Sequence, residues 1–454
     1  MEKSGWLNKQ GGRIKSWKKR YFVLSGPIAR YYSKPGDSQK GLIDLTEATQ
    51  IAADNECKRQ PAIKIVTPKR TFLIQANAEA DRQSWIEAFR NAKNSNSSSN
   101  ALSAPAQPAS VKPQTSDSNQ QTPISVDDFE YIRVLGRGTF GKVQLVKFKR
   151  DGQIYTMKSM KKEVLQEHEH VEQSIVERDI YIKTRHPFLV SAHYSFQTAD
   201  SIFLILDYVP GGELFERLKQ ENKFEESRAK LYAAEIMLAL GHLHSLKLIF
   251  RDLKPENILL DENGHVRLTD FGLVKTNMGA DDSTTTFCGT PEYIAPEMLQ
   301  QKSYTKSVDW WSFGILLYEM LTGLPPFYDS NTSRMYQKIL KDNLEIPSYI
   351  SEEGADFIRK LLERDPQRRL GSSERDCEEL KEHPFFKEYD WDAILAKRIE
   401  PQWKPIIKSE TDTSNFDAQF TAERAGPSYA NAGALNANTQ SSFVGFTCTD
   451  PSAL

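Results

Sequence analysis

Short alternations of apolar and polar residues dominate the first 94 residues. The segments YFVL, ARYY, IKIV and TFLIQA repeat apolar side chains with a period of two, which is typical of half-buried strands. The following stretch, AEADRQSWIEAFRNA, has a helical period that places Trp85, Ile86 and Phe89 on one face. We therefore expect a small antiparallel β-barrel or sandwich, closed at one end by this C-terminal helix.

The pattern is different between residues 129 and 386. Strand-like segments around glycine-rich turns come first, and longer helical segments such as SRAKLYAAEIMLALGHLHS and SVDWWSFGILLYEMLTG follow. That order predicts a small sheet-rich lobe followed by a larger helical lobe. The expected fold class of the whole chain is α+β, with several domains.

A segment without a hydrophobic pattern separates these regions. Residues 95–124 are dominated by Ser, Asn, Gln, Pro and Ala and contain no aromatic side chain. This composition buries too little apolar surface to offset the entropy of ordering the chain, so we expect a flexible linker. The expected boundaries are 1–94 for the first domain, 95–127 for the linker, 128–386 for the second domain and 387–454 for a C-terminal extension.

Composition narrows the class of protein. The 454 residues are 39% hydrophobic and 26% charged, and no apolar run approaches the ~18 residues of a membrane span. The opening MEKSGWLNKQ is polar, so we expect no secretory signal. The four cysteines are far apart, which favours reduced thiols in the cytoplasm over a disulfide framework: Cys57, Cys288, Cys377 and Cys448.

Charge is unevenly distributed along the chain. The formal net charge is -2, but residues 1–94 hold 18 Lys and Arg against 9 Asp and Glu, a net +9, which leaves -11 for the rest. The basic N-terminal region is suited to face an anionic surface.

A glycine-rich segment, LGRGTFGKV, opens the second region and places Gly136, Gly138 and Gly141 between two expected strands. Glycines there let the backbone approach phosphate oxygens without a side-chain clash. By itself the motif also fits a dinucleotide fingerprint or a tight hairpin. No helical pattern follows it, which disfavours the dinucleotide fingerprint.

Charged residues follow at a spacing that is typical of phosphoryl-transfer enzymes. YTMK ends an expected strand with Lys158, and Glu177 lies in the helical segment HVEQSIVERDIYI, where it could pair with Lys158 and aim it at nucleotide phosphates. From this pair alone, two unrelated surface charges remain an alternative.

The segments FRDLKPENILL and TDFGLVK supply the remaining groups that phosphoryl transfer needs. Asp252 would accept the proton of the substrate hydroxyl, and Lys254 would stabilise the transferred phosphoryl group. Asn257 and Asp270 would hold magnesium. Four motifs in this order and at these separations are far more specific than any one of them.

Together with APE at 295–297 and DWWSFG at 309–314, these motifs resemble the eukaryotic protein kinases throughout residues 129–386. The resemblance implies a bilobal kinase fold, ATP as a substrate and Mg²⁺ as a cofactor. It also adds Leu135 and Val143 to the expected ATP site. Phe250 stands where the family usually has the histidine of His-Arg-Asp, and because that position is structural we do not interpret it as a loss of activity.

The segment TTTFCGTPEY resembles the activation segment of the cyclic-nucleotide and protein kinase C related (AGC) group, in which the threonine before Phe-Cys is phosphorylated. That residue is Thr286, and its phosphate is expected to order the segment against Arg251 and Lys275. The family often has a histidine four residues before the helix glutamate. Gln173 occupies this position here, so we expect a looser coupling between the phosphate and that helix.

The same resemblance places Glu213, Glu256 and Glu319 along the peptide cleft. Such carboxylates favour protein substrates with arginines N-terminal to the target Ser or Thr. Upstream kinases are implied as further partners.

The segment KSGWLNKQGGRIKSWKKRYFVL has seven basic residues and no acidic one between Lys3 and Arg20. These charges bracket a turn between two expected strands, where they can converge on one multivalent anion. With the closing helix, the segment resembles a pleckstrin homology domain, whose members that bind 3-phosphorylated inositol lipids use positions corresponding to Lys9, Lys18 and Arg20. Nucleic acid is the competing ligand, but the aromatic residues here occupy expected packing positions, so we expect no nucleic-acid partner.

The segments KRIEPQWKP and SNFDAQF resemble the C-terminal extension of the AGC group, which implies that Phe416 approaches the nucleotide pocket. The terminal FVGFT resembles the group's hydrophobic motif. In that motif Phe443 and Phe446 dock on the small lobe beside the Glu177 helix, and Thr447 is phosphorylated. Cys448 follows where the group has an aromatic residue. An exposed tail that binds another protein is the alternative.

This order of domains is that of the protein kinase B (Akt) family. It implies a cytoplasmic serine/threonine kinase that phosphoinositides recruit to the plasma membrane and that phosphorylation activates. One rival is a membrane-binding adaptor with an inactive kinase domain, against which the intact catalytic motifs argue. The other is a kinase of the same group whose first domain binds protein rather than lipid.

Overall fold

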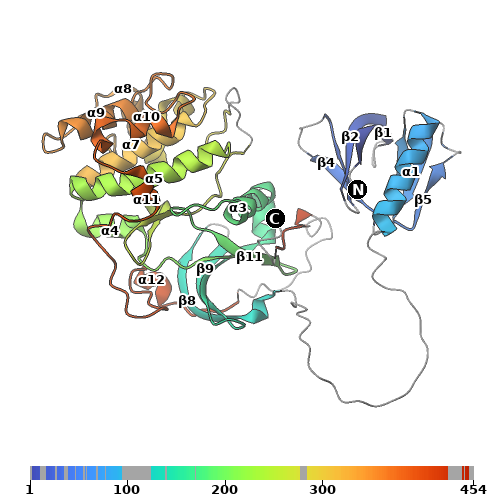
Figure 1. Ribbon diagram of the computed structural model, residues 1–454, viewed down its shortest axis with the longest axis horizontal. Helices are drawn as coiled ribbons and strands as arrows, with labels where there is room; N and C mark the ends of the chain where they lie inside the picture. Colours follow the sequence, from blue (N-terminus) through green and yellow to red (C-terminus); the bar gives the residue numbers. More distant parts are fainter. Residues whose placement is uncertain are drawn as a thin grey trace, which may run out of the picture. The chain divides into compact units, whose positions relative to one another are not determined.

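The structure is a computed structural model, and it divides the chain into two compact units, residues 1–118 and 119–454 (Figure 1). It describes residues 3–10, 17–25, 28–34, 39–45, 48–54, 57, 59–67, 70–76, 78–94, 124–138, 141–168, 170–276, 284–427, 442–443 and 445–448. Most of the expected linker, residues 95–123, therefore lies outside the described residues. Each unit is considered by itself below.

The described part of the first unit is a seven-stranded antiparallel sheet closed by one helix (Figure 1). The strands lie in the order β4-β3-β2-β1-β7-β6-β5. They are β1 (Lys3–Gln10), β2 (Trp17–Ser25), β3 (Ile28–Tyr32), β4 (Gln39–Asp44), β5 (Gln50–Asp54), β6 (Ala62–Val66) and β7 (Thr71–Gln75), and helix α1 is Glu79–Asn94.

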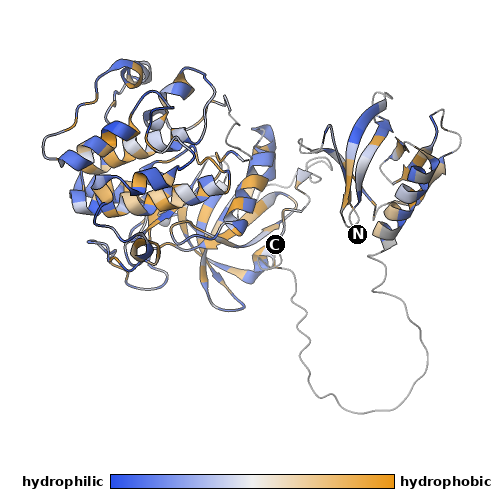
Figure 2. Cartoon of the chain, turned by 45° about the horizontal axis from the view of Figure 1, so that its top comes forward, coloured by the Kyte–Doolittle hydropathy of each residue, from blue (hydrophilic) through white to orange (hydrophobic). Residues whose placement is uncertain are grey.

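Helix α1 packs against β5 and β6 and buries the face that its periodicity predicts, with Trp85, Ile86 and Phe89 all at most 4% exposed. Figure 2 shows hydrophobic and hydrophilic residues side by side along α1, as expected of a helix with one buried face. The antiparallel sheet and its closing helix are confirmed. Strands β4 and β5 were not anticipated, because these two edge strands fully bury only Ile43 and Ile51 and so lack a clear period of two.

The second unit begins with a sheet whose described strands lie in the order β11-β12-β10-β9-β8. The elements of this small lobe are β8 (Phe129–Arg137), β9 (Gly141–Phe148), β10 (Ile154–Lys161), α2 (Lys162–Glu167), α3 (Val171–Lys183), β11 (Ala192–Gln197) and β12 (Ser201–Asp207). Each neighbouring pair is antiparallel. Just before β8, Ile124 and Val126 already pack against an aromatic cluster of this sheet.

The larger lobe is mainly helical. Its principal elements are α4 (Leu214–Glu221), α5 (Glu226–Ser245), β13 (Ile258–Leu260), β14 (Val266–Leu268), α6 (Pro296–Leu299), α7 (Ser307–Thr322), α8 (Thr332–Lys341), α9 (Glu352–Leu361), α10 (Cys377–Lys381) and α11 (Trp391–Leu395). The chain then returns to the small lobe, where α12 (Ala418–Thr421) packs against β8. Helix α7 is buried on almost every face and packs against α5 and α9, because its sequence is apolar nearly all round. Gly323, at a φ of +91°, ends it in the left-handed conformation that glycine adopts without strain.

The predicted order of a sheet-rich lobe before a helical lobe is confirmed. Among the described residues, no helix has the length and apolar character that a membrane crossing requires.

Candidate active site

A cavity of about 500 Å³ is lined by residues of both lobes of the second unit. The catalytic and metal-binding residues expected from the sequence all line it: Asp252, Lys254, Asn257 and Asp270. So do the residues expected to bind ATP: Leu135, Gly136, Gly138, Gly141, Val143, Lys158, Glu177 and Phe416. The structure thus brings together groups that are up to 281 positions apart in the sequence.

The glycine-rich segment joins β8 to β9 at the edge of this cavity. A Cβ atom added to Gly136 or Gly138 would meet no atom within 4 Å, so the backbone there has open space beside it. A Cβ on Gly141 would instead lie 1.7 Å from the backbone oxygen of Ser159. Gly141 therefore allows β9 and β10 to approach, whereas the first two glycines leave room for a ligand.

Lys158, on β10, lies between two carboxylates. Its Nζ donates to Glu177 Oε1 at 2.6 Å and to Asp270 Oδ1 at 3.0 Å. Burial alone would lower the pKa of Lys158, but the negative charges of Asp270 and Glu177 hold it well above its usual value. The same ammonium lowers the pKa of Asp270. The ion pair fixes α3, which carries Glu177, against the sheet.

The segment that carries Asp252 is held by three polar neighbours. The Asn257 amide nitrogen donates to Asp252 at its backbone oxygen (2.8 Å) and its Oδ2 (2.9 Å). The Thr290 hydroxyl donates to Asp252 Oδ1 at 3.0 Å and accepts from Lys254 Nζ, also at 3.0 Å. Thr290 therefore links the two expected catalytic groups. Thr290 was not predicted from the sequence, because it lies 38 residues from Asp252, in a segment whose motif indicates a phosphorylation site.

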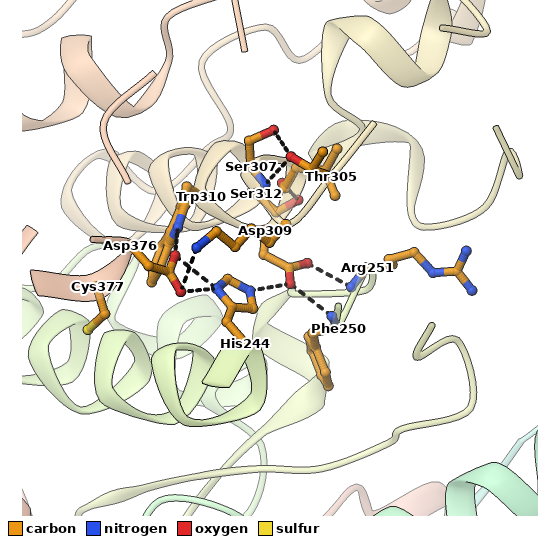
Figure 3. Close-up of polar contacts among 12 residues, drawn as sticks. His244, Phe250, Arg251, Thr305, Ser307, Asp309, Trp310, Ser312, Asp376 and Cys377 are labelled. Carbon is orange, nitrogen blue, oxygen red and sulfur yellow. Dashed lines mark hydrogen bonds and ion pairs between the residues drawn. The ribbon is translucent and has the colours of Figure 1, made fainter. Parts of the chain in front are cut away.

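A buried carboxylate fixes the backbone just before Asp252 (Figure 3). Asp309, on α7, accepts hydrogen bonds from the backbone N–H groups of Phe250 and Arg251, both at 2.8 Å. Arg251 has a φ of +66°, a conformation that non-glycine residues adopt only when the surroundings impose it. The Phe250 side chain is fully buried and packs edge-on against Phe271, which agrees with a structural role at this position.

His244 connects that carboxylate to a second one (Figure 3). Its Nε2 lies 2.8 Å from Asp309 Oδ2, and its Nδ1 lies 3.1 Å from Asp376 Oδ2. Burial opposes the charge of His244, but hydrogen bonds to Asp309 and Asp376 raise its pKa to about 9. Asp376 also accepts from Trp310 Nε1 at 2.8 Å and pairs with Lys306. A protonated His244 therefore ties α5, α7 and the start of α10 to the catalytic segment.

Three acidic residues are expected to recognise the peptide, and the structure describes all of them. Glu213 and Glu256 line the cavity, and Glu319 accepts a hydrogen bond from the Tyr293 hydroxyl. Burial, together with the charge of Glu256, raises the pKa of Glu213 and of Glu319 to about 7. The charge of Glu256 therefore acts on both of the other carboxyls.

The structure describes the activation segment from residue 284 onward, and Thr286 is exposed there. Its backbone oxygen accepts from the Tyr304 hydroxyl at 2.6 Å, and that hydroxyl accepts from Arg251 Nη1 at 3.2 Å. Arg251 is thus connected to Thr286 through Tyr304. Lys275 forms backbone hydrogen bonds with Ile249.

Residues 442–443 and 445–448, the described part of the hydrophobic-motif tail, pack on the small lobe. The Phe443 and Phe446 side chains are 0% and 1% exposed. Gln197 Nε2 donates to the Phe443 backbone oxygen at 2.8 Å, and the Ser195 hydroxyl donates to that of Phe446 at 2.7 Å. Cys448 forms a backbone bridge with Ser195, at 2.7 and 2.8 Å.

Two cations flank the docked rings, and Phe416 forms a separate contact. Lys162 Nζ lies 5.3 Å from the Phe443 ring, and the Arg178 guanidinium lies 5.3 Å from the Phe446 ring. Arg178 directly follows Glu177 on α3, so the tail contacts the helix that carries the Lys158 partner. Thr447 remains exposed. Phe416 stacks on Tyr208 with ring centroids 6.1 Å apart.

In the first unit the strand register gathers the basic residues. Lys9 lies opposite Lys18, and Leu7 lies opposite Arg20, so the three cations share one face of the sheet. Burial and the nearby charges of Arg70 and Arg20 lower the pKa of Lys9 to about 8. Arg70 precedes β7 and was not predicted. About fifty residues separate it from the basic segment that contains Lys9, Lys18 and Arg20.

Comparisons with known proteins agree with this architecture. The protein kinase domain family matches residues 129–386, the PH domain family matches residues 1–94, and the protein kinase C terminal domain family matches residues 407–448. The chain is 44% identical to a RAC family serine/threonine-protein kinase homolog of Dictyostelium discoideum, over 98% of this chain and 96% of that protein. It is 38% identical to the RAC serine/threonine-protein kinase of Drosophila melanogaster, over 93% of this chain and 74% of that protein. It is 37% identical to the RAC-beta serine/threonine-protein kinase of Homo sapiens, over 93% of this chain and 91% of that protein.

The two-lobed unit and its cavity define a protein kinase, an enzyme that uses ATP as its phosphoryl donor and Mg²⁺ as its cofactor. With a PH domain before the kinase domain and a C-terminal domain after it, the chain belongs to the protein kinase B (RAC or Akt) family of serine/threonine-protein kinases.

Proposed function

We propose that this kinase transfers the γ-phosphate of ATP to Ser or Thr in arginine-rich sequences, and that phosphoinositides recruit it from the cytoplasm to the plasma membrane. The proposed organisation is a pleckstrin homology domain (1–94), a linker (95–127), a kinase domain (128–386) and a regulatory C-terminal extension (387–454). The observation that carries the catalytic proposal is the convergence of the Asp252 segment, the Lys158 ion pair and the glycine-rich segment on one cavity.

In this proposal Asp252 is the proton acceptor, and its polar contacts support that role. Its two carboxylate oxygens accept from Thr290 and Asn257, which orient the side chain before a substrate arrives. Asp252 accepts the proton of the substrate hydroxyl, and Lys254, 3.3 Å from Asp252 Oδ2, provides positive charge for the transferred phosphoryl group. Lys158, aligned by Glu177, holds the nucleotide phosphates.

The donor set near Asp252 suits magnesium. The amide nitrogen of Asn257 donates to Asp252, which leaves the Asn257 Oδ1 atom available. In Asp270 only the Oδ1 atom takes part in the ion pair with Lys158. Both side chains line the cavity, and oxygen ligands are those that Mg²⁺ prefers. When bound, the ion neutralises negative charge on the phosphates.

The proposed peptide site rests on the acidic group of Glu213, Glu256 and Glu319. Carboxylates that are crowded and partly buried gain most from a guanidinium, because it relieves their mutual repulsion and supplies paired hydrogen bonds. We therefore assign these residues to arginines N-terminal to the phosphorylated residue.

Membrane recruitment is assigned to the shared face of Lys9, Lys18 and Arg20, joined by Arg70. Burial and the neighbouring charges of Arg70 and Arg20 lower the pKa of Lys9, so the charged form of this lysine gains from an anion placed beside it. A multivalent anion such as a 3-phosphorylated inositol headgroup would compensate all of them at once.

Activation is assigned to phosphates on Thr286 and Thr447, added by upstream kinases. Both hydroxyl-bearing residues are exposed. A phosphate on Thr286 would lie near Arg251, and one on Thr447 would extend a tail that already contacts α3 through Arg178.

The experiment that tests this function measures phosphate transfer by the full chain to two peptides that differ only in having arginines or alanines before the target serine. We expect kcat/KM to fall at least about tenfold without the arginines. Equal rates on both peptides would contradict the substrate assignment. No transfer at all, even after Thr286 is phosphorylated, would favour the adaptor hypothesis.

A further inference from the structure

The tail contacts the small lobe at a second place, beside the glycine-rich segment. Helix α12 packs against β8, the strand that ends at Arg137, between Gly136 and Gly138. Arg137 Nε lies 3.0 Å from both carboxylate oxygens of Glu423, and its Nη2 lies 2.5 Å from Oε2. Two donors of one guanidinium thus face one carboxylate, which is the most directional geometry available to such a pair.

Three further hydrogen bonds hold the same stretch of tail. Arg133 Nη1 donates to the Thr421 backbone oxygen at 3.3 Å, and Lys142 Nζ donates to that of Arg424 at 3.2 Å. The backbone N–H of Gly426 donates to Oε1 of the buried Gln144 at 3.0 Å. The tail therefore contacts β8 and β9, the two strands that the glycine-rich segment connects.

We propose that Glu423 is a positioning residue for nucleotide binding, because its carboxylate holds Arg137 and with it the glycine-rich segment at the mouth of the cavity. A segment with three glycines has many accessible conformations, and ordering it when ATP binds costs conformational entropy. A tail contact that is present before ATP arrives removes part of that cost. Glu423 carries its charge without modification, so the contact does not depend on an upstream kinase.

The exposure of the pair sets the size of the effect. The side chains of Arg137 and Glu423 are 57% and 30% exposed, so solvent screens their attraction. We expect the KM for ATP to rise about 2- to 5-fold when the pair is broken, with kcat little changed. This inference rests on the proposed role of the glycine-rich segment in binding ATP.

The test uses the full chain with Glu423→Gln, with Arg137→Glu, and with the charge-reversed pair Arg137→Glu/Glu423→Arg. Glu382→Gln is the matched control, since it breaks another arginine–glutamate pair, with Arg375, that is 57% and 63% exposed. The readouts are KM for ATP, kcat, and the Kd for Mg·ADP. We expect both single variants to raise KM and Kd, the reversed pair to restore them in part, and the control to match the unmodified protein.

An unchanged KM and Kd in Glu423→Gln would overturn the proposal. A raised KM that the reversed pair does not lower would also overturn it, because Glu423 would then act on something other than Arg137. The unmodified protein, assayed alongside, separates this inference from the proposed function. If that protein shows no saturable ATP dependence, the proposed ATP site fails; if it does and the variants match it, only the positioning role fails.

Discussion

The Ser195 hydroxyl donates a hydrogen bond to the backbone oxygen of Phe446 across 2.7 Å, although the two residues are 251 positions apart. Ser195 lies on β11, an edge strand, and its backbone also pairs with Cys448, so the tail extends the sheet by one short bridge. On its other side Phe446 faces Arg178, the neighbour of Glu177. The tail is therefore in contact with the helix that aligns Lys158.

Removing the Phe446 ring should lower activity. Burial of such a ring contributes roughly 1.5–3 kcal/mol, and if the docked tail favours the paired position of α3, its loss shifts α3 away from Lys158. We expect Phe446→Ala to reduce kcat/KM at least about tenfold in protein phosphorylated at Thr286. Ile406→Ala, which truncates a tail side chain that is 79% exposed, should have no effect. Equal rates for Phe446→Ala and the unmodified protein would mean that the tail serves another partner.

Long, largely apolar helices could be predicted from the sequence almost to the residue. The segment predicted as a helix over 227–245 is α5 (Glu226–Ser245), and the one over 307–323 is α7 (Ser307–Thr322). Their apolar residues face the core on nearly every side, so local pattern and packing agree. Edge strands such as β4 bury too little to produce such a signal.

The candidate site was predictable where a local motif marks it and not where distant residues complete it. Asp252 and Asn257 lie within one motif, and the structure places them in hydrogen-bond contact. Asp309 lies 65 residues from His244, and no spacing rule relates the two. Such contacts follow from the packing of α5 against α7, which only the three-dimensional structure supplies.

The pH dependence of peptide binding should reflect the acidic group. The pKa values of Glu213 and Glu319 are raised to about 7, so these carboxyls are ionised above pH 7 and become protonated below it. A protonated carboxyl loses its charge attraction to arginine. We expect the KM for the arginine peptide to rise several-fold between pH 8 and pH 6.

The alanine version of the same peptide serves as the control, and its KM should change little over this range. A parallel rise for both peptides would assign the effect to a group other than these two glutamates.

The stability of the kinase unit should fall in mild alkali. His244 has a folded-state pKa of about 9, above its ordinary 6.5, so its stabilising interaction with Asp309 and Asp376 is complete below pH 6.5 and is lost as the pH rises through 9. We expect the free energy of unfolding in urea to decrease by on the order of 1–3 kcal/mol from pH 6.5 to pH 9.5. Lys306 and Trp310 also contact Asp376.

Asp376→Asn weakens one side of this interaction while keeping the shape of the side chain, and it should flatten the pH slope. His244→Gln should abolish it. A slope that is the same in Asp376→Asn and in the unmodified protein would show that another group causes the alkaline loss.

Membrane recruitment should depend on one face of the first unit. We expect Arg20→Ala and Arg70→Ala each to weaken sedimentation with vesicles that contain 3-phosphorylated inositol lipids by about tenfold, because each removes a charge-assisted contact. Arg30 pairs with Val23 in the register and so lies on the opposite face of the sheet, which makes Arg30→Ala a matched control. Equal losses for all three variants would indicate nonspecific attraction, and no loss in Arg20→Ala would exclude this face.

The most direct measurement is the comparison of phosphate transfer and nucleotide binding in Asp252→Asn. The substitution keeps the shape of the side chain and leaves Lys158, Asn257 and Asp270 in place, but it removes the group that accepts the substrate proton. We predict that turnover of the arginine peptide falls at least about a thousandfold while the Kd for Mg·ADP changes less than about threefold. Turnover close to that of the unmodified protein, or an equal loss of nucleotide affinity, would contradict the role assigned to Asp252.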